Sequence, residues 1–102
     1  MKIIEKISNM IEDEIEGANQ YGKCAVKYKD EYPMLAKVFY DIATVELTHV
    51  DLLHAQVVKL IEEYRRTSGD PPKEMQWVYN YLHDKQIEKA NQAKNYLATY
   101  RG

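Results

Sequence analysis

Glu46 and His49 lie three residues apart in a stretch whose other regularly spaced residues are apolar. Side chains three apart share one face of a helix, so a carboxylate and an imidazole placed in this way can reach the same metal ion. An unpaired carboxylate is costly to bury, and a bound cation would offset that cost. The spacing therefore predicts that both residues are metal ligands on an inward-facing stripe, whose apolar members are Leu35, Val38, Ile42, Leu53, Val57, Leu60 and Tyr64.

Glu14 interrupts an earlier apolar pattern in the same manner. With a tight turn centred on Glu31, Glu14 lies 17 residues before the turn. Glu46 and His49 lie 15 and 18 residues after it. These differences correspond to only about 2 to 5 Å along a helix axis, so the three side chains are predicted to meet. The stripe that contains Glu14 also holds Ile4, Ile7, Ile11, Ala18, Tyr21, Ala25 and Tyr28.

Two carboxylates and one imidazole form a ligand set that suits iron or manganese. Zinc is also compatible, because carboxylate and histidine ligands together with water satisfy its coordination. Thiolate chemistry is not expected, since Cys24 is the one cysteine of the chain and is predicted to pack as a small apolar side chain.

Three long helices are predicted to carry these residues, over residues 3–29, 33–66 and 71–100, in one all-α domain spanning residues 1–102. Pro33 is suited to the first turn of the second helix, and Gly69 to its end. Asp70 is expected to cap the third helix, which would begin at Pro71. The first two helices should form a long antiparallel hairpin, and Gly17 in the first helix indicates a close approach by another backbone.

The third helix has a thinner and more polar stripe, formed by Met75, Val78, Tyr79, Leu82, Gln86, Ala90, Ala93 and Leu97. Helices of this length measure roughly 40 to 50 Å, and 102 residues spread over three such rods cannot close a thick core. We therefore expect a homo-oligomer, a dimer or a multiple of dimers, in which stripes from different chains pack together.

The composition excludes several classes of function. Fourteen basic and sixteen acidic residues give a net charge of −2, which argues against binding to nucleic acid or to an anionic membrane. The opening stretch MKIIEKISNMIEDEIEG contains acids and lacks the unbroken apolar core of a signal peptide. The single cysteine fits a reducing compartment, so a cytoplasmic location is expected.

The combination of Glu14, Tyr21 and the segment Glu46-Leu47-Thr48-His49 resembles the ferritin-like di-iron superfamily. In that superfamily a Glu from each of two helices and an E-x-x-H pair from each of two others surround the metals. This chain has one E-x-x-H pair and so supplies half of such a site. Its layout is most similar to the short encapsulated ferritins, whose hairpins pair across a two-fold axis.

The resemblance implies a four-helix bundle completed by dimerisation, with two irons held by two copies of Glu14, Glu46 and His49. Tyr21 would orient a ligand through a hydrogen bond. The implied activity is that of a ferroxidase, an oxidoreductase that oxidises Fe(II) with O2 or peroxide for iron storage or detoxification.

Two alternatives remain open. The chain could be a non-catalytic assembly or adaptor protein, for example of a phage or mobile element, that uses its tyrosine-rich faces to bind partners. The same ligands could instead hold a structural zinc or calcium ion. His54 and His83 are expected to be surface or interface histidines outside the site.

Overall fold

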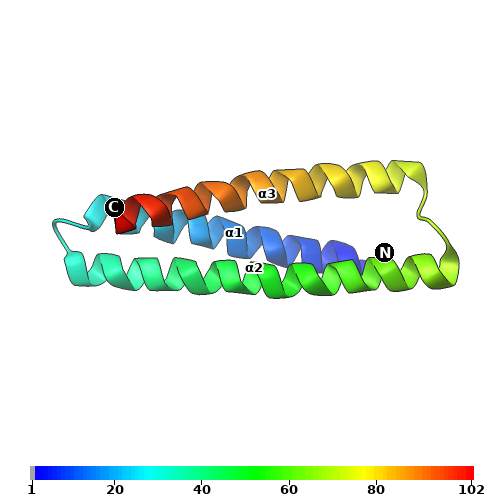
Figure 1. Ribbon diagram of the computed structural model, residues 1–102, viewed down its shortest axis with the longest axis horizontal. Coiled ribbons are helices and arrows are strands. Elements are labelled where there is room, and N and C mark those ends of the chain that lie inside the picture. Colours follow the sequence, from blue (N-terminus) through cyan, green and yellow to red (C-terminus); the bar gives the residue numbers. More distant parts are fainter. Residues whose placement is uncertain (1) are drawn as a thin grey trace.

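The computed structural model describes residues 2–102 and consists of three helices, α1 (Lys2–Tyr28), α2 (Pro33–Ser68) and α3 (Lys73–Arg101) (Figure 1). Strands do not occur in this described range, so the prediction of an all-α fold with three helices is confirmed. The molecule is a rod with dimensions of 55 × 19 × 18 Å. None of its helices, within residues 2–102, is long and apolar enough to cross a membrane.

Prolines and glycines determine where the helices begin and end. Pro33 lies in the first turn of α2, and Gly69 ends that helix with a positive φ of 80° while its N–H donates to the carbonyl of Arg65. The prediction that Asp70 caps α3 is wrong, since the residue before Lys73 is Pro72 and no side chain caps the helix. A residue that precedes proline is held out of the helical region, so Pro71-Pro72 delays the start of α3.

α1 lies between the other two helices and packs against both, whereas α2 and α3 make few contacts with each other (Figure 1). Glu14 reaches His49, and further along α1 the ring of Tyr21 packs against Phe39, which comes earlier in α2. Residues later in α1 therefore contact residues earlier in α2. α3 is fastened to α1 by Gln86, whose Nε2 donates to the Ser8 hydroxyl at 2.9 Å.

Small side chains form most of the core. The alanines at positions 18, 25, 36, 43 and 93 are completely covered, and Ile15 is the largest side chain that is almost completely covered. Small residues at these positions bring the helix axes close together. The apolar stripe predicted for α2 is mostly outside this core, because Leu35 is 46% exposed and Val38 50% exposed. α2 instead turns Ala36 and Ala43 inward.

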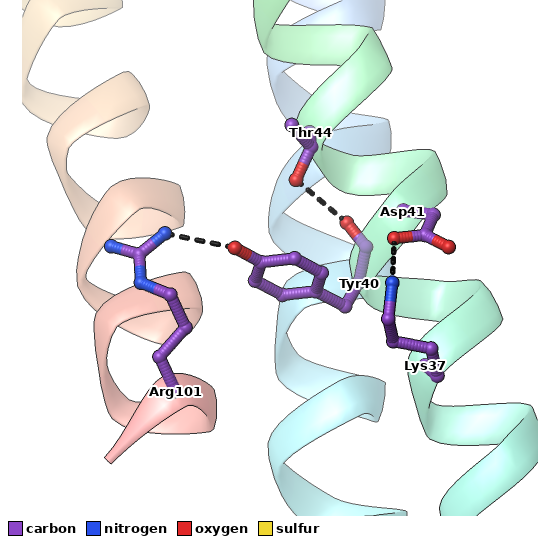
Figure 2. Close-up of polar contacts among 5 residues, drawn as sticks. All are labelled: Lys37, Tyr40, Asp41, Thr44 and Arg101. Carbon is purple, nitrogen blue, oxygen red and sulfur yellow. Dashed lines mark hydrogen bonds and ion pairs between the residues drawn. The ribbon is translucent and has the colours of Figure 1, made fainter.

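The end of α3 is fastened to the beginning of α2, as Figure 2 shows. The Tyr40 and Tyr100 rings stack with centroids 4.7 Å apart, and Arg101 Nη1 donates to the Tyr40 hydroxyl at 2.9 Å. Beside Tyr40 on α2, Lys37 pairs with Asp41 at 2.6 Å. The contacts of Tyr40 hold α2 beside α3 at this end of the rod.

Candidate metal centre

Two of the three predicted ligands are in contact across the α1–α2 interface. Glu14 Oε2 lies 3.3 Å from His49 Nδ1, close enough for the imidazole to donate a hydrogen bond to the carboxylate. Glu14 is half-buried, and His49 is exposed on α2. The contact agrees with the register deduced from the turn, in which the two residues lie at nearly the same distance from residue 31.

The third predicted ligand, Glu46, lies against Gly17 of α1. Its Oε2 is fully covered and has no hydrogen-bond partner. A Cβ atom at position 17 would overlap this carboxylate. The expectation that Gly17 admits a neighbouring backbone is therefore corrected, since the atoms that approach it belong to the Glu46 side chain.

The surroundings of Glu46 disfavour its negative charge. Burial raises the pKa of the Glu46 carboxyl group above its ordinary value, and the charge of Glu14 raises it further. Nearby His49 lowers this pKa in part. A cation bound here would act in the same direction as His49 and with a larger charge, so the electrostatics fit a metal ion.

An open groove on the surface of the rod gives access to these side chains. It is lined by Glu14, Glu46 and His49 together with three further residues of α2, Asp41, Ile42 and Val45. Asp41 is not among the ligands predicted from the sequence, because it precedes Glu46 by five residues and so falls outside the E-x-x-H spacing. The carboxylate of Asp41 is already paired with Lys37, whose pKa is raised mainly by that hydrogen bond.

One chain presents these ligands without enclosing a metal. Within residues 2–102, histidine, cysteine, aspartate and glutamate side chains do not gather in threes at metal-binding geometry. Glu14 and His49 bond to each other, and the Glu46 carboxylate rests on Gly17. The donor types fit iron, manganese or zinc. A closed site would require donors from outside the chain, together with small rotations of these three side chains.

Tyr21 lies on the same helix as Glu14, two turns further on. Its ring packs against Phe39 with centroids 5.9 Å apart. The hydrogen bonds found among residues 2–102 do not link Tyr21 to Glu14, Glu46 or His49. Its role in orienting a ligand remains a prediction that follows from the family resemblance.

Other residues considered in the sequence lie elsewhere. Cys24 is a half-buried free thiol on α1. His54 and His83 are distant from each other along the chain but are in contact, Nε2 to Nε2, at 2.9 Å. Helical periodicity places each histidine on its own helix, and it gives no signal that the two side chains are in contact.

In comparisons with known proteins, no family model, curated protein or solved structure matches the chain.

Proposed function

We propose that this chain is a ferritin-like metal-binding protein that binds iron at Glu14, Glu46 and His49 and oxidises Fe(II). Two copies pair so that their grooves face each other, and each contributes half of a di-iron centre. The chain would thereby form a four-helix bundle from two α1–α2 pairs. O2 or peroxide would serve as the oxidant.

The observation that carries this proposal is the covered and unpartnered oxygen of Glu46. Buried carboxylate oxygens are nearly always hydrogen-bonded, and one without a partner is a costly exception. Here it lies beside a second carboxylate and an imidazole, and the glycine beneath it costs about 1 kcal/mol of helix stability relative to alanine. A cation would satisfy this oxygen and offset the repulsion between the two acids.

The apolar surface around the ligands supports the pairing of two chains. Ile42 and Val45 line the groove on one side of the ligands, and Met10, Leu52 and Leu53 line a continuation of it past Glu14 and His49. Val45 is 52% exposed and Leu52 is 63% exposed in the single chain. Packing of a second copy on this face would bury these side chains and bring its own three ligands toward the first set.

In this arrangement the residues of the chain would have separate tasks. The two carboxylates would hold the metal ions and neutralise part of their charge, and His49 would supply a neutral nitrogen donor in place of its hydrogen bond to Glu14. An Fe(II) ion held in this way would give one electron to O2 or peroxide and become Fe(III).

The test uses tag-free protein grown with iron, compared with the variants Glu46→Gln and His49→Gln. The parent should contain about one iron per chain and oxidise added Fe(II), as two half-sites of the ferritin-like pattern require. Both variants should lose iron and oxidation while keeping their helical content. Glu16→Gln, an exposed acid on α1, is the matched control and should behave like the parent. Iron oxidation by the variants at the parent's rate would overturn the assignment.

The adaptor function is the second candidate, and the surface of α3 favours it. Trp77 is 71% exposed and stacks on Tyr81 with ring centroids 6.0 Å apart. Exposed aromatic pairs are frequent at protein interfaces. A metal-free parent would favour this function, whereas zinc or calcium without oxidation would favour a structural ion at the same ligands.

A further inference from the structure

His54 and His83 form a second pair of nitrogen donors, and it lies on a different side of the molecule from the proposed iron site. His54 follows His49 by five residues, which turns it by about 140° around the axis of α2. It faces α3, where its Nε2 lies 2.9 Å from that of His83. The ring centroids are 5.0 Å apart and the ring planes differ by 23°.

We propose that His54 and His83 form a two-imidazole binding site for a divalent transition metal such as Zn2+ or Cu2+. The two nitrogen atoms approach head to head, and the N–H of one imidazole donates a hydrogen bond to the nitrogen of the other. Two nitrogen ligands of a tetrahedral zinc lie about 3.3 Å apart, since each Zn–N bond measures about 2.0–2.1 Å. The two Nε2 atoms therefore have to move apart by about 0.4 Å, and both rings have to tilt so that their lone pairs point at the metal instead of at each other.

The position of the pair suits a site that exchanges metal with solvent. His54 is half-buried and His83 is exposed. Both histidines line two adjoining grooves between α2 and α3, one walled mainly by apolar residues such as Val57 and Leu82, the other also by Asp51 and Lys94. The helices make few other contacts with each other, so the small separation required meets little resistance.

Metal binding at this pair requires that both Nε2 atoms are free of protons. In the hydrogen-bonded pair the donating ring carries its proton on Nε2. When both Nε2 atoms bind a metal, that proton has to be on Nδ1, so the donor ring changes tautomer and no net proton is released from a neutral pair. Protonated rings must lose protons first. The charged groups that line the grooves around the pair are Glu5 on α1, Asp51 on α2 and Lys94 on α3. Two of these three are acids and favour a cation.

The experiment uses the tag-free chain with Glu46→Gln and His49→Gln, which removes two of the three proposed iron ligands. Its outcome is therefore independent of the proposed function. Zn2+ titration should show about one ion per chain with unchanged molecular mass. Adding His54→Gln or His83→Gln should weaken binding by more than about tenfold, because even the loss of a residue that supports a ligand weakens metal sites by about 10- to 100-fold.

A spectroscopic probe separates chelation by this pair from loose surface binding. With Cu2+, electron paramagnetic resonance should show two coordinated nitrogens in the double variant and one after His83→Gln. Glu88→Gln, an exposed acid on α3, is the control and should leave both results unchanged. Zinc affinity that is the same with and without the two histidines, or binding of half an ion per chain accompanied by a doubled mass, would overturn the proposal.

Discussion

Gly17 lowers the stability of helix α1, and the space that it leaves beside the helix holds the carboxylate of Glu46. Glycine in a helix interior costs about 1 kcal/mol relative to alanine. The space that alanine would fill is occupied by the Glu46 carboxylate, one oxygen of which is covered and unpartnered. Neither feature stabilises a metal-free chain, and the proposed role of Glu46 as a metal ligand accounts for both.

Gly17→Ala should separate stability from metal binding. The helix gains up to about 1 kcal/mol from the substitution, and the flexible Glu46 side chain swings away from the new methyl group. Denaturant unfolding with chelator should therefore show equal or higher stability, while iron or zinc affinity falls. Gln20→Ala, at an exposed position of α1, is the control and should not change affinity. Parent-like metal affinity in Gly17→Ala would show that the position of Glu46 is irrelevant to binding.

The raised pKa of Glu46 predicts a dependence of stability on pH. Because the folded state holds this proton more tightly than the unfolded chain, the contribution of Glu46 to stability is complete below about pH 4.3, the ordinary glutamate value. It is lost as the pH rises through the raised pKa of the folded state. With chelator at neutral pH, Glu46→Gln should therefore be more stable than the parent, by no more than about 1 kcal/mol for a partly exposed group.

Unfolding curves measured from pH 4 to pH 8 test this prediction. The difference between Glu46→Gln and the parent should shrink toward pH 4, because the carboxyl group of Glu46 takes up its proton as the pH falls. Saturating metal should reverse the order at neutral pH, because the ion binds the folded parent more tightly than the variant. A parent that gains stability relative to the variant as the pH rises without metal would contradict the assigned cause.

The helices illustrate what periodicity can and cannot predict. In α1 the stripe read from the sequence contains Ile4, Ile11, Ala18 and Ala25, and all four are buried. In α2 the predicted apolar stripe also lies along the helix, but its residues Leu35 and Val38 remain exposed in the single chain. Periodicity identifies the apolar face of a helix, but it does not say whether the same chain or another chain covers that face.

The turn-forming residues predicted where the breaks between the helices lie, but they did not predict the residue at which α3 begins. Pro33 and Gly69 act through their own backbone geometry, which the sequence reveals directly. The Glu14–His49 contact followed from counting residues on either side of a short turn. The contact between His54 and His83 could not be predicted, since it depends on how α3 rotates about α1, and the weak stripe of α3 leaves that rotation open.

The position of α1 between the other helices makes its buried face the main source of stability. Ile15 is 1% exposed and is among the few large side chains covered in the single chain. Ile15→Ala should lower the free energy of unfolding by about 2 to 5 kcal/mol, because it leaves a cavity. Ile3→Ala, on the same helix but exposed, should cost much less. Equal losses for both in denaturant unfolding would mean that the packing around α1 is not as described.

The whole molecule has more surface than a chain of its mass usually retains. Its accessible surface is 7213 Å², whereas about 6,000 Å² is typical for a monomer of 12.0 kDa. The radius of gyration of 16.3 Å also exceeds the value of about 13 Å for a compact domain of this length. The excess surface is of the order that each partner loses in a standard interface, about 800 Å². This argues that the proposed pairing completes the fold as well as the site.

Leu52→Lys tests the pairing and the metal centre together. Leu52 lines the groove beside Glu14 and His49, so a lysine there would place a cation in the proposed interface, next to the ligands. The mass in solution should fall from that of a dimer, or of a multiple of dimers, toward 12.0 kDa, and bound iron should be lost although all three ligands remain. Val78→Lys, at an exposed apolar position of α3, should leave mass and iron content unchanged. If Leu52→Lys keeps both the parent's mass and its iron, the two half-sites do not meet across this face.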